Sequence, residues 1–486
     1  MPFDYLTDFL TALQDDGDLR RISAQVDPVL EVAEIVDRVA ATPDGGPALL
    51  FEKVHGSPLP LVTNLLGSSR RVCRALGVKS LDELTEKAAS LLRPEVTENW
   101  LQKLKLAPQA AQFSVWPPQM VKTGTSQQVV KMGRDVNLTD LPALQSRPLE
   151  GARFLNGALV VTRDPDSGER MFETFPLELR DANTLGVHWT PHHRAFQWYH
   201  EHARRETPMP VVIAWGGDPV LNVLVRAAAP PFITQGSYAG FLRGKGLELV
   251  KCRQVELDTP AHAEIVLEGY LEPREEWEPG GACAEATGFY GATEPVPILH
   301  VTAVTHRGNP IVSAILPSPA PSEEYWIAQA IERMDLPLLR TFIPELVDVH
   351  APPFSAAEGF RFVSIQKRYP QQSRKVLQAL WGCERTMFSR TIVVVDADVD
   401  VHNADAVWRE VDRNVDPLCD LLPTEGPTQG AGRSPGSRGF GPKLGIDATR
   451  KLAAELDNTP PPVPAVMSDE TRALVQRRWP EYRIGG

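Results

Sequence analysis

Residues 246–291 read GLELVKCRQVELDTPAHAEIVLEGYLEPREEWEPGGACAEATGFYG, and this stretch decides how the rest of the chain is interpreted. From Val255 to Glu272 apolar residues recur at about every second position, which predicts a strand interrupted by a turn around Pro260. Glu264 and Glu268 are then expected to share one face of the strand. Because four residues of strand span roughly 13 Å, one ion cannot easily engage both carboxylates. Only one of them is therefore a metal-ligand candidate.

A third carboxylate, Glu285, lies in the segment GGACAEATGFYG that ends this stretch. Small side chains flank it and let backbone or a ligand approach closely. A proton donor would suit that place. The alternative interpretation is that Glu264 and Glu285 are both solvated residues at strand edges.

The residues LRGKGLELVKCRQVELDTPAHAEIVLEGYLEP, followed by Glu285 and TGFY, resemble the core signature of the UbiD family of prenylated-flavin-dependent decarboxylases. The similarity extends over nearly the whole chain, and its early and late segments look most like the menaquinone-biosynthesis branch. The segments that carry it are GDLRRISAQVDPVLEVAEIVDR (17–38), RDPDSG (163–168), LGVHW (185–189), PLLRTFIPELVDVH (337–350), IQKRYPQQSRKVLQALWG (365–382), IVVVDADVDVH (392–402) and KLGIDATRK (443–451).

The resemblance implies a split β-barrel flavin-binding domain between two α/β regions, assembled as a homodimer or larger homo-oligomer. The residue pattern agrees, because helical and strand patterns alternate at both ends of the chain and strand patterns dominate the middle. We expect an N-terminal α/β domain over residues 1–116, a barrel domain over 117–317 and a C-terminal α/β oligomerisation domain over 318–486.

Composition narrows the functional classes. The 50 basic and 62 acidic side chains give a formal charge of −12, which argues against broad binding of nucleic acid or of an anionic membrane. The five cysteines are scattered and odd in number, so neither a disulfide framework nor a CxxC metal site is indicated. The first residues carry acids where a signal peptide needs bases, and no apolar run reaches membrane-spanning length. We expect a cytoplasmic protein.

The resemblance also implies a cofactor, prenylated FMN, which the family binds through a divalent metal, usually manganese, with K⁺ nearby. The metal ligands are typically an asparagine, a histidine and a glutamate. The histidine matches His192 and the glutamate matches Glu264, whereas the asparagine position holds Met171, a thioether that is a poor ligand for a hard cation. Manganese binding is therefore expected to be weak or absent.

Two further family positions are substituted. The arginine that orients the substrate carboxylate falls on Pro176, and the first glutamate of the family's acidic pair falls on Gly280. The second acid is present as Glu285, the expected catalytic proton donor. Lys443 matches the lysine beside the cofactor phosphate.

Other motifs have competing interpretations. His188, His192 and His193 lie close enough in sequence to bind a metal together. The alternative is that they are structural or solvated. The segment that begins at Gly67, GSSRRVCRALG, has two interpretations, an ordinary helix start and a phosphate-binding site. The acids of DADVD (396–400) cap a strand end or bind a cation. The Gly-rich basic loop 430–443 covers an anionic ligand or is a surface loop.

Three functions follow from these observations. The first is decarboxylation of an aromatic or α,β-unsaturated carboxylic acid, impaired or divergent, with Arg180, Arg153 or Glu278 as substitute groups. The second is a non-catalytic binding or partner subunit, which would act in a hetero-oligomer with an intact relative. The third is an unrelated flavin oxidoreductase, since split barrels also bind ordinary flavins.

Overall fold

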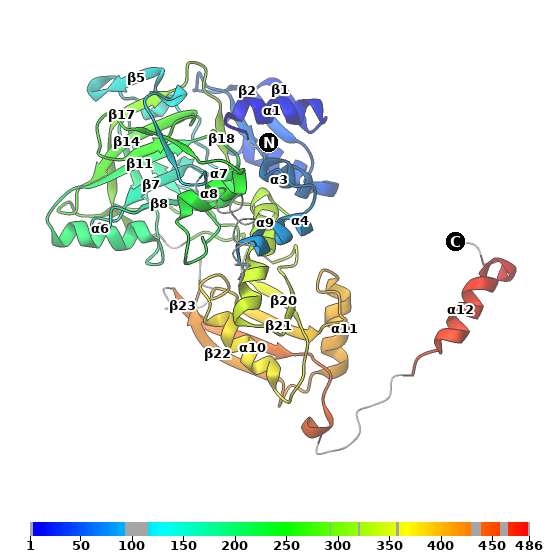
Figure 1. Cartoon of the computed structure of the whole chain (residues 1–486). Helices are drawn as coiled ribbons and strands as arrows, with labels where there is room; N and C mark the ends of the chain where they lie inside the picture. Colours follow the sequence, from blue (N-terminus) through cyan, green and yellow to red (C-terminus); the bar gives the residue numbers. More distant parts are fainter. Residues whose placement is uncertain are drawn as a thin grey trace, which may run out of the picture.

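The computed structural model describes residues 3–92, 115–291, 293–318, 321–355, 359–428, 439–456 and 465–484. Helices and strands alternate at both ends of the chain, and strands dominate the middle (Figure 1). This mixed α/β fold with a curled central sheet confirms the predicted fold class. The division at residues 116 and 317 stays a prediction. Short 3-10 helices join the larger elements at Pro43–Gly45, Thr125–Gln127, Gly133–Asp135, Leu138–Asp140, Ala453–Glu455 and Trp479–Tyr482.

The N-terminal part is a four-stranded sheet with helices packed against it. The strands, in sheet order, are β1 (Leu19–Val26), β2 (Ala48–Val54), β3 (Leu61–Thr63) and β18 (Val312–Ala314). The helices are α1 (Leu6–Asp15), α2 (Glu31–Ala40), α3 (Ser69–Leu76) and α4 (Leu81–Leu91). Because β18 comes from much later in the chain and pairs in parallel with β3, the central part is tied to this sheet.

The segment that begins at Gly67 is an ordinary helix start. The Ser68 side chain accepts a hydrogen bond from the backbone N–H of Arg71 and so caps α3. The Arg71 guanidinium is buried and donates to the backbone carbonyls of Leu65 and Asn64 at 3.2 and 3.1 Å. Its positive charge therefore faces inward to the backbone and is not presented to a phosphate.

The central part is a curled antiparallel sheet that forms half a barrel. Its strands, in sheet order, are β6 (Phe154–Leu155), β9 (Leu177–Leu179), β10 (Thr184–Val187), β17 (Ile298–His306), β14 (Ile265–Leu271), β11 (Met209–Trp215), β7 (Leu159–Arg163) and β8 (Arg170–Glu173), with β5 (Val129–Met132) also paired to β17. A small sheet contains β13 (Asp258–Pro260), β12 (Glu248–Lys251) and β4 (Gln119–Val121), and a hairpin contains β15 (Glu278–Pro279) and β16 (Pro295–Val296). The interrupted strand predicted between Val255 and Glu272 is thus confirmed as β13 and β14.

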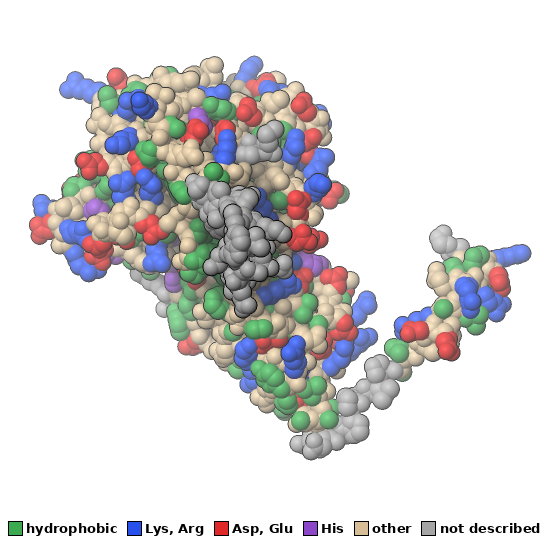
Figure 2. All heavy atoms as spheres, in the orientation of Figure 1, with side chains coloured by type: hydrophobic (Ala, Val, Ile, Leu, Met, Phe, Trp, Pro, Cys, Tyr) green, Lys and Arg blue, Asp and Glu red, His purple; other side chains and the backbone are tan. Residues whose placement is uncertain are grey.

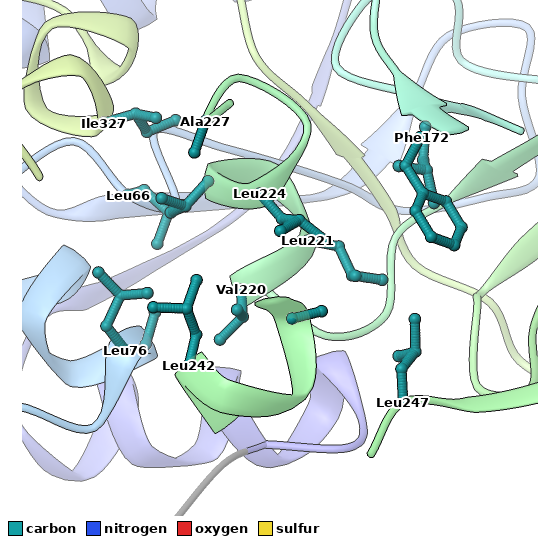
Figure 3. Close-up of a cluster of buried hydrophobic side chains, with 14 of the residues drawn as sticks. Leu66, Leu76, Phe172, Val220, Leu221, Leu224, Ala227, Leu242, Leu247 and Ile327 are labelled. Atoms are coloured by element: carbon teal, nitrogen blue, oxygen red, sulfur yellow. The ribbon is translucent and has the colours of Figure 1, made fainter. Parts of the chain in front are cut away.

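One continuous apolar core joins the N-terminal and central parts. Helices α6 (Arg194–Arg204), α7 (Val220–Leu224) and α8 (Gln235–Arg243) belong to the central part. Leu221 and Leu224 of α7 belong to the same buried cluster as Leu76 of α3, Phe172 of β8 and Ile327 of the long helix α9 (Glu323–Phe342) (Figure 3). This shared core fixes the sheet that carries the candidate site against α9.

The C-terminal part is a five-stranded sheet. Its strands, in order, are β19 (Leu346–His350), β20 (Phe360–Ile365), β21 (Thr391–Asp396), β23 (Phe440–Asp447) and β22 (Leu421–Pro427), accompanied by helices α10 (Gln372–Trp381) and α11 (Ala404–Asn414). Arg450 engages two acids at the end of β21, through its backbone N–H to Asp396 at 2.8 Å and its guanidinium to Asp398 at 2.7 Å. These acids therefore fasten the chain after β23.

The surface mixes charges of both signs. Acidic and basic side chains are interspersed over the face shown in Figure 2. The last described helix, α12 (Asp469–Arg478), stands apart from the body of the molecule (Figure 1). Within the residues that the structure describes, no helix combines the length and the apolar character needed to cross a bilayer.

Candidate active site

Glu285 lies in a tight turn inside the β15–β16 hairpin. Its backbone N–H donates to the Phe289 carbonyl at 3.0 Å, and its own carbonyl accepts from Gly288 at 3.0 Å. The half-buried side chain accepts from the Thr287 hydroxyl at 3.4 Å. A Cβ at Gly291 would lie 2.9 Å from Oε1 of Glu285, so the glycine leaves room for this carboxylate.

Glu150 fastens one side of this hairpin. Its buried carboxylate accepts from the backbone N–H groups of Ser146 and Ala284 at 2.5 and 3.0 Å. Nearby, the backbone N–H of Leu149 donates to the Tyr290 hydroxyl at 3.1 Å. The segment around Glu150 therefore fixes both strands of the turn that carries Glu285.

Glu178, on β9, fastens the other side. One of its oxygens, Oε2, accepts from His188 Nε2 at 2.8 Å, from the Gly281 backbone N–H at 3.0 Å and from Arg180 Nη2 at 3.2 Å. Burial acts to raise the pKa of Glu178, but the hydrogen bonds from His188 and Gly281 and the charge of Arg180 outweigh it and lower the pKa. Arg180 also donates to the Pro279 carbonyl at 2.5 Å.

The substituted family positions lie around this cluster. Met171 is on β8, in register with Thr162 of β7, and the Pro176 carbonyl accepts from the His188 backbone at 3.1 Å. A Cβ at Gly280 would lie 2.5 Å from the Glu294 carbonyl oxygen and 3.2 Å from His188 Cε1. A glutamate at position 280 would therefore displace backbone, and the His188 ring lies beside that position.

The three neighbouring histidines have three different environments. His188 pairs with Glu178, as described above. His193 Nδ1 contacts the backbone N and the hydroxyl of Thr190 at 3.0 Å, and burial lowers the His193 pKa to about 4. His192 is exposed, and its ring packs edge-on against Phe388 of the C-terminal part with ring centroids 5.0 Å apart. They do not converge on a common point, so the histidine-cluster metal hypothesis gains no support.

The predicted metal glutamate, Glu264, has other partners. The side chain is fully buried and accepts from Arg307 Nη1 at 3.1 Å and from the Ile311 backbone N–H at 3.0 Å. Arg307 in turn contacts the Thr7 hydroxyl of α1, at the N-terminal part, whereas His192 faces the C-terminal part. Burial raises the pKa of Glu264, although Ile311 and Arg307 act to lower it.

The surroundings of Glu264 and His192 do not fit a divalent cation. A guanidinium already bound to the carboxylate takes the place that a metal would need. In the described part of the chain, no three His, Cys, Asp or Glu side chains are grouped so that they could hold a metal ion. The metal-ligand assignment of His192 and Glu264 stays a prediction that this geometry does not favour.

Sequence reasoning overlooked Gln235, the first residue of α8. Its buried amide accepts from the Phe172 backbone N–H and donates to the Phe172 carbonyl, each at 2.8 Å. Phe172 follows Met171, so Gln235 is the polar side chain that reaches this part of β8. Its amide is already hydrogen-bonded to the backbone. No periodicity or motif marked Gln235, because its partner is a backbone group distant in sequence.

Lys443, on β23, is buried and supports the loop that reaches His192. Its ammonium donates to the Ser389 carbonyl at 3.2 Å and also to the Met387 carbonyl. These carbonyls flank Phe388, the residue that packs against His192. Residues 430–438 of the predicted Gly-rich loop lie outside the described residues.

The amino end of α6, next to His192, is already capped. The Glu173 carboxylate accepts from the backbone N–H groups of Arg194 and Ala195, both at 2.8 Å. Burial raises the pKa of Glu173 despite these two bonds. Two of the first helix amides that an anion would use are therefore engaged by a side chain of the protein.

Three family models match the chain. They are the N-terminal domain (residues 10–91), the Rift-related domain (119–320) and the C-terminal domain (325–448) of UbiD, described as 3-octaprenyl-4-hydroxybenzoate carboxy-lyase. Two uncharacterized proteins are similar over the full length. That of Aquifex aeolicus is 37% identical over 99% of this chain and 98% of its own, and that of Archaeoglobus fulgidus is 35% identical over 99% of both chains.

Solved structures agree with these matches. HmfF from Pelotomaculum thermopropionicum, in complex with FMN, is 26% identical over 96% of this chain and 95% of its own, with a TM-score of 0.77. The closed form of vanillic acid decarboxylase from Sedimentibacter hydroxybenzoicus has a TM-score of 0.85 over 99% of this chain and all of its own, and at 23% identity it shows the fold alone. Family models over most of the sequence and relatives above 30% identity along all of it establish that the chain belongs to the UbiD family of decarboxylases.

Proposed function

We propose that the protein removes carbon dioxide, without net oxidation, from an aromatic or α,β-unsaturated carboxylic acid, with a flavin as cofactor. Family membership supports the reaction class, and HmfF has been solved with FMN and, in an evolved dimeric form, with prFMN. The observation that carries the proposal is Glu285, a half-buried carboxylate in a hairpin that Glu150 and Glu178 fasten from two sides.

Glu285 is the proposed proton donor. When the carboxylate carbon leaves as carbon dioxide, the electron pair of the broken C–C bond remains on the substrate and must be protonated. Glu285 gives that proton and is reprotonated from solvent. Each turnover consumes one substrate carboxylate and one solvent proton. It releases one carbon dioxide and one product with a new C–H bond.

Arg180 is the proposed substitute for the arginine that the family has at Pro176. Its Nη2 is engaged by Glu178 and Pro279, whereas Nη1 has no hydrogen-bond partner among the described residues. A substrate carboxylate bound there would gain a charge-assisted hydrogen bond, typically worth about 1.5–3 kcal/mol.

The residues present fit a flavin better than a metal. Three buried donors, Thr162 Oγ1, Arg180 Nε and Trp189 Nε1, have no hydrogen-bond partner in the described part of the structure, which suits a ligand rich in acceptors. We propose that His192 and the loop held by Lys443 border the flavin. Such a cofactor supplies an electron sink that no side chain offers. Manganese and K⁺ are left out of the proposal, since Glu264 is bound to Arg307.

The alternative is a non-catalytic binding or partner subunit that acts beside an intact relative. The observation in its favour is that Met171, Pro176 and Gly280 occupy three positions where the family has functional side chains. The vanillic acid decarboxylase of Sedimentibacter hydroxybenzoicus, ShVdcCD, has been solved with a truncated second component, ShVdcD. The substrate, and any connection to menaquinone biosynthesis, stay predictions.

A homo-oligomer is also proposed, with the C-terminal region as its interface. The exposed side chains on and around α12 include Met467, Leu474, Trp479 and Ile484, which are large and apolar. Apolar side chains on a helix that stands apart from the body are typical of an association surface. Light scattering should give a mass above that of one chain, and removal of residues 465–486 should lower it.

The decisive experiment is co-expression with a flavin prenyltransferase, followed by absorption spectroscopy and mass spectrometry of the bound small molecule. The holoprotein is then given a panel of aryl and acrylic acids while carbon dioxide release and solvent deuterium incorporation are followed. Turnover that Glu285→Gln abolishes, and that Glu276→Gln at an exposed position of the same segment leaves intact, supports the enzyme. A protein that binds no flavin and turns over no acid supports the partner subunit.

A further inference from the structure

The hydrogen bonds of Glu178 fix the tautomer of His188. The lowered pKa of Glu178 keeps the carboxylate ionised at neutral pH, and an ionised carboxylate can only accept hydrogen bonds. His188 Nε2, 2.8 Å from Glu178 Oε2, must therefore carry the proton. In the neutral ring, Nδ1 then holds the lone pair and is the basic nitrogen.

Nδ1 of His188 is available for chemistry. The side chain is only 13% exposed, yet Nδ1 has no hydrogen-bond partner among the described residues and is not sealed from solvent. The same ring edge lies beside Gly280, because His188 Cε1 is 3.2 Å from the position of a Cβ there. The open nitrogen thus stands next to the place where the family carries the first carboxylate of its acidic pair.

We propose that His188 Nδ1 is an acid–base atom of this site, in place of the side chain missing at Gly280, and that Glu178 is its positioning residue. This inference rests on the proposed function. In each turnover Nδ1 takes a proton from solvent, and the imidazolium returns it to restore the Glu285 carboxyl after Glu285 has protonated the product. Proton and charge balance, because one solvent proton is consumed for each carbon dioxide released.

The surrounding charges favour this relay. Glu178 orients the ring through Nε2, and Arg180 donates to the same carboxylate. On the hairpin side, Glu285 and Glu150 are the acidic side chains that face the same region, since both, with Glu178, add to the effect of burial in raising the pKa of Cys283. The proton donor and the histidine therefore lie in one electrostatic neighbourhood.

A purely structural role for His188 would leave different signatures. A structural histidine needs only the hydrogen bond from Nε2 to Glu178, and its role would not depend on the protonation of Nδ1. The chain offers a matched control pair, since His262 Nε2 contacts Glu248 at 2.9 Å with no link to the hairpin.

The first measurement uses the ligand-free protein and does not depend on activity. Nitrogen-15 NMR of labelled histidines should show His188 as the Nε2–H tautomer in the wild type and as a mixture in Glu178→Gln. The resonance is assigned by its loss in His188→Gln, and Glu248→Gln should leave it unchanged. An Nδ1–H tautomer in the wild type would overturn the inference.

The second measurement uses the holoprotein and an acid that it turns over. We expect His188→Gln to lower kcat by about 10²–10⁴-fold and to remove one limb of the pH profile, with partial rescue of His188→Gly by added imidazole. Glu178→Gln should shift that limb, and Glu248→Gln should not. Full kcat and an unchanged profile in His188→Gln would overturn the relay. A wild type inert to every acid overturns the proposed function and the relay together, while the tautomer measurement still decides whether the pair forms.

Discussion

The carboxylates at and just before β14, Glu268 and Glu264, have different surroundings from those of the candidate site. Glu268 is fully buried and is held by backbone N–H groups of residues 253–255, at 2.6–3.4 Å. Glu264 is equally buried and held by Arg307 and Ile311. Glu178 instead shares its oxygen with a histidine whose second nitrogen stays open. A carboxylate surrounded by fixed donors stabilises the fold, whereas one that leaves a titratable neighbour open can take part in proton transfer.

The two regions also differ in the direction of their pKa shifts. Burial dominates at Glu264 and raises its pKa, whereas hydrogen bonds and charge outweigh burial at Glu178 and lower its pKa. The contrast shows that burial alone does not identify a functional acid. The partners of the carboxylate decide its protonation state, and they come from distant parts of the sequence.

The largest effect on stability is expected from removal of the Glu268 side chain. Glu268→Ala removes the acceptor for the backbone N–H groups of Arg253 and Gln254, and leaves donors without a partner in a partly buried loop. We expect the free energy of unfolding to fall by about 2–4 kcal/mol. Urea unfolding of the variant beside wild type measures it, with turnover per folded molecule unchanged. A variant as stable as wild type would remove the structural role assigned to Glu268.

The second prediction concerns the space at Gly280. Gly280→Ala places a Cβ 2.5 Å from the Glu294 carbonyl oxygen, so backbone must move, and overpacking of this kind typically costs about 1–3 kcal/mol. Gly151→Ala is the matched control, because its nearest neighbour, the Cα of Gly281, is 3.9 Å away. Thermal unfolding of both variants tests the difference. Equal melting temperatures would contradict the steric conflict assigned to a Cβ at Gly280.

The fold was largely predictable from the sequence because its signals are local. The apolar spacing of Leu6, Phe9 and Leu13 is enough to predict α1, and the alternation between Val255 and Glu272 predicts β13 and β14. Each depends on side chains a few positions apart. Tertiary packing then strengthens these preferences and does not overturn them.

The site was less predictable because its contacts depend on strand register. Glu178 meets His188 because β9 and β10 pair with Glu178 opposite Gly186, and no local pattern encodes that register. His188 was instead grouped with His192 and His193, its neighbours in sequence. Family positions located Glu285, Met171, Pro176 and Gly280 in the sequence but not the side chains that stand beside them.

The third prediction uses pH to separate the two regions. The lowered pKa of Glu178 contributes stability that is present above the unfolded pKa, near 4.3, and is lost as the pH falls through the lower folded value. The raised pKa of Glu264 has the opposite sign, so its contribution grows as the pH falls from the folded value toward 4.3. Unfolding free energies are therefore measured at pH 7 and at pH 3. On going to pH 3, the stability difference between wild type and Glu178→Gln should shrink by on the order of 1 kcal/mol. The stability difference between wild type and Glu264→Gln should grow by on the order of 1 kcal/mol. Shifts of the same sign would contradict the contrast.

The smallest expected effect is the response of metal binding to Glu264→Gln. The amide oxygen can still accept from Ile311 or Arg307, so the stability cost at pH 7 should be about 1 kcal/mol or less. Because Arg307 occupies the carboxylate and His192 faces the C-terminal part, the substitution should leave the manganese content after dialysis unchanged. Elemental analysis of wild type, Glu264→Gln and His192→Ala measures it, with Glu276→Gln as the control for a lost surface charge. Stoichiometric manganese that Glu264→Gln and His192→Ala each abolish would show that both residues bind the metal after Arg307 has moved away. Glu264 would then belong with the functional acids, and Glu268 alone would remain as the purely structural carboxylate of the comparison.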